Sequence, residues 1–178
     1  MLTPETPAPS VAELIRRLAL EPHPEGGWYR RVYADSGLVA PADGRGARPA
    51  VTAIYYLLAA GQFSRWHRVR SAEIWSLLEG GPLVLATFNA ANNVFAEHPL
   101  TGPTDSALAA AAGESLYAVP AGVWQAARAL DDYALVSCVV VPGFDWADFA
   151  WLRDFPDDLA AMRAVLEGQE PSPWSECV

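Results

Sequence analysis

The sequence lacks the features that place a protein in or across a membrane. No run of apolar residues is long enough to span a bilayer. The N-terminal segment MLTPETPAPS has neither the basic nor the apolar region of a secretory signal peptide. The two cysteines, Cys138 in an apolar run and Cys177 near the C-terminus, are weak evidence for a disulfide. We therefore expect a cytoplasmic protein that does not act at a membrane.

Positive charge is also scarce. The chain has 12 Lys and Arg residues against 21 Asp and Glu residues, and the basic residues form no cluster. Because phosphate backbones select clustered Lys and Arg, no nucleic-acid partner is expected. With 178 residues, 52% of them hydrophobic, the chain can bury the core of one globular domain. We assign this domain to residues 10–178 and expect residues 1–9 to be flexible.

Glycine and proline divide the rest of the chain into short apolar segments. Ser10 and Glu13 form a capping box before a predicted helix at 11–20. Asp157 near the start and Gly168 at the stop indicate a second helix at the C-terminal end. The segments 37–49 and 105–115 are predicted loops. Strands are predicted at 27–35, 50–59, 64–69, 72–80, 82–89, 93–100, 115–122, 123–129 and 133–143. This pattern is typical of a mostly β antiparallel sandwich or barrel with short terminal helices.

The segment GQFSRWHRVRSAEIWSLLEG at 61–80 contains the first candidate site. Alternate side chains of a strand share a face, so His67 and Val69 point the same way, as do Glu73 and Trp75 in the next strand. A hairpin between these strands would bring the imidazole of His67 to the carboxylate of Glu73. Such a pair suits acid–base chemistry near neutral pH. A structural His–Glu ion pair at a strand end is the open alternative.

The same segment resembles the first motif of the cupin superfamily, G-x5-H-x-H-x3,4-E-x6-G, with Val69 in place of the second histidine. The segment GESLYAVPAGVWQAARA is similar to the second motif, with Gln125 at the histidine position and Ala129 at the asparagine position. The fragments HPEGGWYRRVY, TAIYYLL, VPAGVWQAA and PGFDWADF resemble the cupin-5 group. This resemblance implies a double-stranded β-helix, the cupin jelly roll, usually assembled as a homodimer. It implies no particular reaction.

The resemblance also bears on metal binding. Metal-dependent cupins typically use three histidines and one glutamate to bind Fe, Mn, Ni or Zn, whereas the matching positions here are His67, Val69, Glu73 and Gln125. Valine cannot ligate a metal, and a neutral amide is a poor ligand compared with imidazole. We therefore expect no cofactor. If a divalent metal does bind, the ligands implied are His67, Glu73 and Gln125, which a side chain of the PHPEGG turn could complete.

Small barrels of this kind enclose a ligand cavity, so we expect a small-molecule ligand, such as a carbohydrate-like compound. Gln125 can both donate and accept hydrogen bonds, which suits a hydroxyl or a carbonyl group. Candidate pocket residues are His67, Glu73, Gln125, Tyr55, Tyr117, His23 and Glu25, with Trp75, Val69 and Val123 as the apolar wall.

Metal-free cupins offer one analogy for catalysis. The dTDP-sugar epimerases use a histidine base and a tyrosine acid to move a proton next to a carbonyl group. By that analogy His67 is the predicted base, with Glu73 beside it and Tyr117 as the acid. Two alternatives stay open from the sequence. One is a metal-dependent oxygenase or isomerase, and the other is a ligand-binding module without catalysis.

Overall fold

The computed structural model describes residues 10–102, 114–167 and 172–178. The predicted flexible N-terminus, most of the loop at 105–115 and the helix stop at Gly168 lie outside these residues. The N-terminal helix α1 (Val11–Leu18) begins as its capping box predicts, since Ser10 Oγ accepts a hydrogen bond from the Glu13 amide. It ends two residues before the predicted limit, where Ala19 adopts a left-handed conformation.

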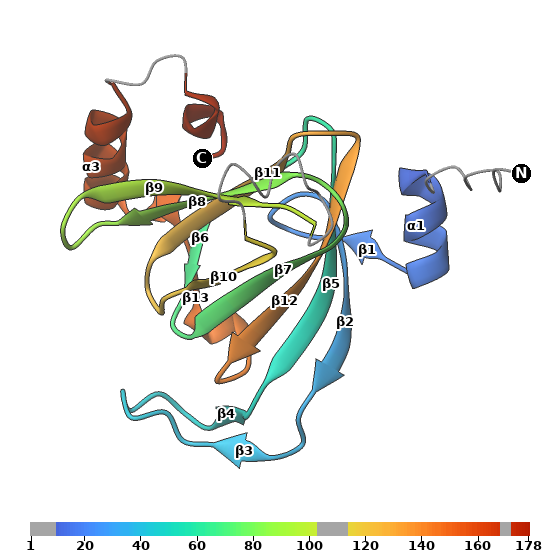
Figure 1. Cartoon of the computed structure of the whole chain (residues 1–178). Coiled ribbons are helices and arrows are strands. Elements are labelled where there is room, and N and C mark those ends of the chain that lie inside the picture. Colours follow the sequence, from blue (N-terminus) through green and yellow to red (C-terminus); the bar gives the residue numbers. More distant parts are fainter. Residues whose placement is uncertain (1–9, 103–113, 168–171) are drawn as a thin grey trace, which may run out of the picture.

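The strands form two antiparallel sheets that face each other, as expected for a jelly roll (Figure 1). The six-stranded sheet runs, in order, β1 (Glu21–Pro22), β2 (Trp28–Ala34), β5 (Thr52–Ala59), β12 (Tyr133–Val141), β7 (Ala72–Gly80) and β10 (Leu116–Val119). The five-stranded sheet runs β13 (Phe149–Trp151), β6 (Phe63–Val69), β11 (Trp124–Ala129), β8 (Leu83–Asn89) and β9 (Val94–Leu100). Every strand predicted from the sequence is present, and the mostly β prediction is confirmed.

Shorter elements complete the chain. The predicted loop at 37–49 is wrong in one detail, because β3 (Leu38–Val39) and β4 (Arg48–Pro49) pair within it. After β12 come η1 (Trp146–Asp148), η2 (Leu152–Asp154), the C-terminal helix α3 (Pro156–Leu166) and η4 (Pro173–Glu176). No helix in the described part of the chain is long and apolar enough to cross a membrane.

Three clusters of buried apolar side chains pack the sheets and helices together. The first lies between the two sheets and includes Tyr56, Trp75 and Leu85. The second lies on the outer face of the five-stranded sheet, beside which α3 is seen in Figure 1, and it includes Phe88, Trp124 and Leu166 of α3. The third joins α1 to the outer face of the six-stranded sheet. Because these cores bury both faces of several strands, the sequences of those strands are nearly continuous apolar runs rather than strict alternations.

Candidate functional site

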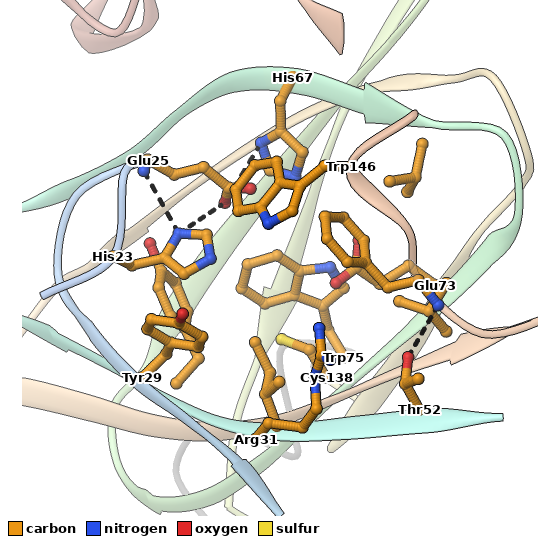
Figure 2. Close-up of a pocket in the computed structure, with 15 residues that line it drawn as sticks. His23, Glu25, Tyr29, Arg31, Thr52, His67, Glu73, Trp75, Cys138 and Trp146 are labelled. Atoms are coloured by element: carbon orange, nitrogen blue, oxygen red, sulfur yellow. Dashed lines mark hydrogen bonds and ion pairs between the residues drawn. The ribbon is translucent and has the colours of Figure 1, made fainter. Parts of the chain in front are cut away.

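A pocket opens into the barrel from the end where β2, β5, β6, β7 and β12 meet the loop after β12 (Figure 2). The space among its lining atoms, counting the open mouth and the solvent in it, is about 610 Å³. The pocket is lined by His23, Glu25, Tyr29, Arg31, Thr52, Ile54, Tyr56, His67, Val69, Glu73, Trp75, Cys138, Val140, Phe144 and Trp146.

His67 and Glu73 come from different sheets. The predicted hairpin between their strands is wrong, because β6 pairs with β11 and β13 whereas β7 pairs with β10 and β12. The turn after β6 carries the chain from one sheet to the other, so the two side chains meet across the barrel interior. Gln125 on β11 lies directly opposite His67 in the five-stranded sheet and shares its inward face.

A hydrogen-bond network fixes these three side chains. The indole N–H of Trp75 donates to Oε1 of Gln125 at 3.0 Å, so the amide NH₂ must face the other way. That NH₂ group donates to Oε2 of Glu73 at 2.6 Å and lies 3.1 Å from Nε2 of His67. The Nδ1 atom of His67 lies 2.7 Å from the carbonyl oxygen of Arg65, which can only accept. His67 is therefore the neutral tautomer with its proton on Nδ1, and both ring nitrogens have partners.

The PHPEGG turn brings a second carboxyl group to the same imidazole. The turn is tied to β6 because the Arg65 amide donates to the Glu25 carbonyl oxygen at 2.9 Å. Oε2 of Glu25 accepts a hydrogen bond from Ser64 at 3.0 Å and lies 3.5 Å from Nδ1 of His67 (Figure 2). Gly26 permits this close docking, since its φ is +110° and a Cβ there would collide with the Phe63 carbonyl oxygen.

Burial shifts the protonation of these groups towards their neutral forms. Desolvation raises the pKa of Glu73 to about 7 and that of Glu25 to about 8. It lowers the pKa of His23 to about 4, with a contribution from His67, and it lowers the pKa of His67 as well. At neutral pH the contact between Glu25 and His67 is therefore mainly one between neutral groups. His67 and Glu73, the pair that the sequence left open as a structural ion pair, are joined through the side-chain amide of Gln125.

The residues at the cupin metal positions do not fit a metal ion. The NH₂ group of Gln125 stands between His67 and Glu73, so it occupies the lone pair of His67 Nε2 and one carboxylate oxygen of Glu73. The amide oxygen is held by Trp75, and Val69 has no donor atom. Within residues 10–102, 114–167 and 172–178 no group of three or more His, Cys, Asp or Glu side chains is arranged to hold a metal.

Three of the predicted pocket residues lie elsewhere. Tyr55 is on the outer face of β5, because Ile54 and Tyr56 on either side of it point inward, and it packs in the cluster beneath α1. Tyr117 lies on the edge strand β10 and stacks on His98 with 3.6 Å between ring centroids. Val123 sits in the turn before β11 and packs against the inner core. The prediction of Tyr117 as the catalytic acid therefore does not fit this geometry.

The remaining predicted residues are together in the pocket or directly behind it. The fully buried Gln125 is hydrogen-bonded to three of the lining residues, which include His23, Glu25, His67, Val69, Glu73 and Trp75. The sequence did not predict the other nine lining residues, which are Tyr29, Arg31, Thr52, Ile54, Tyr56, Cys138, Val140, Phe144 and Trp146. Tyr29 and Arg31 are two residues apart on β2 and therefore share a face of that strand. The strand period of two would have predicted both as pocket residues if the inward face of β2 had been known.

An ion-pair cluster holds the segment at the pocket mouth. Asp148 of η1 is buried and accepts hydrogen bonds from Arg45 at 3.0 Å and from Arg48 at 2.9 and 3.0 Å. These arginines lower the pKa of Asp148, although burial opposes the shift. Trp146, two residues earlier and half exposed, is thereby fixed beside His23, with 6.2 Å between their ring centroids.

Comparisons with known proteins agree with this architecture. Residues 12–152 match the family model described as "Cupin superfamily (DUF985)". A hypothetical protein from Leishmania major is 28% identical with a TM-score of 0.75, and the match covers 88% of this chain and 98% of that one. A protein from Shewanella oneidensis is 28% identical with a TM-score of 0.71, covering 89% and 98%.

A more distant solved structure shares the fold alone. Oxalate decarboxylase from Bacillus subtilis is 18% identical with a TM-score of 0.53, and the match covers 88% of this chain and 37% of that one. A search of curated proteins gives no match.

Proposed function

Since this chain belongs to the cupin superfamily, in the group described as DUF985, we propose that it is a metal-independent isomerase or epimerase that moves a proton next to a carbonyl group of a small molecule. The observation that carries the proposal is a pair of buried carboxyl groups, Glu73 and Glu25, in one pocket. The neutral imidazole of His67 lies between them, in contact with Glu25 and joined to Glu73 through Gln125. Groups whose pKa values lie near the working pH are the most effective acid–base catalysts.

Glu73 is better placed than His67 to be the base. Both nitrogens of His67 are engaged, so its lone pair is directed at the Gln125 amide rather than at a ligand. Glu73 uses only Oε2 for its hydrogen bond, and no described residue is bonded to Oε1. With a pKa of about 7, the carboxyl group of Glu73 exists in both forms at neutral pH. His67 and Gln125 are then positioning residues that hold this carboxylate.

Glu25 replaces the predicted tyrosine as the acid. Its pKa of about 8 keeps it mostly protonated at pH 7, and a carboxylic acid can donate to a developing negative charge. The pocket tyrosine Tyr56 is less suitable, because its hydroxyl donates to the Gly26 carbonyl oxygen at 2.8 Å. Two carboxyl groups whose pKa values differ can divide the base and acid roles between them.

The proposed step is balanced without a co-reactant. The Glu73 carboxylate removes a proton from the carbon beside the carbonyl group. The electron pair of that C–H bond forms the carbon–carbon double bond of an enolate, and the carbonyl π pair moves to oxygen, where Glu25 donates. In the return step the Glu25 carboxylate takes a hydroxyl proton of the enol, and Glu73 gives its proton back to carbon. Delivery to the other face of the same carbon, after the enol has turned over in the pocket, gives an epimer. Where that carbon bears a hydroxyl group, loss of this hydroxyl proton to Glu25 and delivery to the former carbonyl carbon give an isomer. The closed apolar wall around Trp75 and Val69 keeps water from competing.

Solvent deuterium incorporation tests the proposal. The protein is incubated in D₂O with a panel of 2-oxo acids, uronates and sugar phosphates, and carbon-bound deuterium is measured by NMR. Glu73→Gln should lower the rate by about 100-fold or more, as expected for loss of an acid–base group. Glu79→Gln is the matched control, because Glu79 lies on the same strand but outside this pocket.

Equal rates for the wild type and Glu73→Gln would contradict the assignment of Glu73. A panel compound that binds in the pocket without any exchange would instead support the ligand-binding module.

A further inference from the structure

Arg31 brings a positive charge into this pocket. On β2 it lies opposite Ile54 of β5, and both residues line the pocket because cross-strand partners share a face. Figure 2 shows the side chain extending from the lower edge of the view toward the pocket interior. Among the lining residues it is the sole arginine.

The guanidinium of Arg31 has no ion pair or hydrogen bond with any residue that the structure describes. The ion pairs near the mouth use other arginines: Arg45 and Arg48 share Asp148, and Arg70 pairs with Asp43. Neither pocket carboxyl group pairs with Arg31, because Glu25 accepts a hydrogen bond from Ser64 and Glu73 accepts one from Gln125. The charge of Arg31 is therefore available to a ligand.

Aromatic surface lies beside this charge. Trp146 is half exposed at the mouth, and its ring is 5.1 Å from that of Phe144, which also lines the pocket. Tyr29 lies two residues from Arg31 on the same face of β2 and packs edge-on against His23 at 4.4 Å. A flat or ring-shaped body could pack here while an anionic end reaches the guanidinium.

We propose that the pocket selects a small carbonyl compound that carries a carboxylate or phosphate group, with its anionic oxygens paired to Arg31 and its body against Trp146 and Phe144. Arginine suits this role because its planar fork donates two parallel hydrogen bonds to either anion. The proposal deepens the proposed function by naming the substrate class, and it rests on that function only for the carbonyl group.

Binding measurements with three probes test the anion site. Phenylpyruvate provides a carboxylate, its methyl ester is the neutral match, and phenyl phosphate provides a phosphate. By calorimetry, the wild type should bind at least one anion about 10-fold or more tightly than the ester, the size of one charge-assisted contact. Arg31→Gln should remove this preference, and Arg31→Lys should restore part of it.

Arg30→Gln is the matched control, because Arg30 is also exposed on β2 but faces outward over Tyr55, with 5.8 Å between its guanidinium carbon and the ring centroid. It removes the same charge and should leave the preference unchanged. Tighter binding of phenylpyruvate than of phenyl phosphate assigns a carboxylate substrate, and the reverse assigns a phosphate. The proposal is overturned if neither anion binds the wild type more tightly than the ester does. It is also overturned if Arg31→Gln binds the anions as tightly as the wild type.

Failure of catalysis is separable from failure of this site. Anion binding that depends on Arg31, without deuterium incorporation into any compound, removes the proposed proton transfer and keeps the anion site. Deuterium incorporation that is lost in Glu73→Gln but unchanged in Arg31→Gln keeps the proton transfer and removes the anion site.

Discussion

Replacing Glu73 by glutamine should stabilise the fold above neutral pH while it removes catalysis. The pKa of Glu73 is raised from 4.5 to about 7 in the folded protein, chiefly because the carboxyl group is buried. The folded state therefore holds a proton that the unfolded chain has already lost. The stability linked to this proton is fully present below pH 4.5 and is lost as the pH rises through about 7.

The magnitude follows from the pKa difference. Each pKa unit corresponds to about 1.4 kcal/mol, so ionising Glu73 in the folded state removes roughly 3 kcal/mol from the free energy of unfolding once the pH is above 7. At pH 5 the same effect is only about 1 kcal/mol or less. Glutamine cannot ionise, and its side-chain oxygen can still accept the hydrogen bond from Gln125.

Urea unfolding at pH 5 and pH 8 measures this effect. Glu73→Gln should match the wild type within about 1 kcal/mol at pH 5 and exceed it by roughly 2–3 kcal/mol at pH 8. Glu79→Gln serves as the control for replacing a carboxylate on the same strand outside the pocket. A variant no more stable than the wild type at pH 8 would refute a raised pKa for Glu73, as would an equal difference at both pH values.

Three further predictions test the surroundings of the site. Gln125→Met removes the hydrogen-bond partner of three groups, the Trp75 N–H, the acceptor nitrogen of His67 and Oε2 of Glu73, so urea unfolding should show a loss of several kcal/mol, about 1–3 for each group. Gly26→Ala should lower the melting temperature far more than Gly61→Ala, because both glycines have positive φ but a Cβ at Gly61 meets no atom within 4 Å. Tyr117→Phe should leave the deuterium incorporation rate unchanged, and a large loss would restore Tyr117 as a catalytic residue.

The fold was predictable because its signals are local. Apolar segments bounded by Gly and Pro located the strands, and the capping box at Ser10 located the first helix. The same locality explains the error at 37–49, where two-residue strands are too short to produce a periodic pattern.

The site was only partly predictable, because its geometry depends on pairings between distant segments. Tyr55 and Tyr56 are adjacent aromatic residues, so alternation alone could not decide which one faces the pocket. The contact of Glu25 with His67 requires docking of the PHPEGG turn on β6, and no pattern within either segment encodes that distance. Val69 and Gln125 did show from the sequence that strong metal ligands are missing. The network in which Gln125 joins His67 to Glu73 depends on the register of β11 against β6.

Turnover after metal removal is the most direct test of the central claim that Glu73 moves the proton without a metal. The protein is purified without a metal-chelating tag, dialysed against EDTA, and assayed for deuterium incorporation before and after addition of Fe, Mn, Ni or Zn. The account predicts the same rate in the chelated and untreated protein, with no increase on adding any of these ions. A rate that falls on chelation and returns with one of them would contradict it.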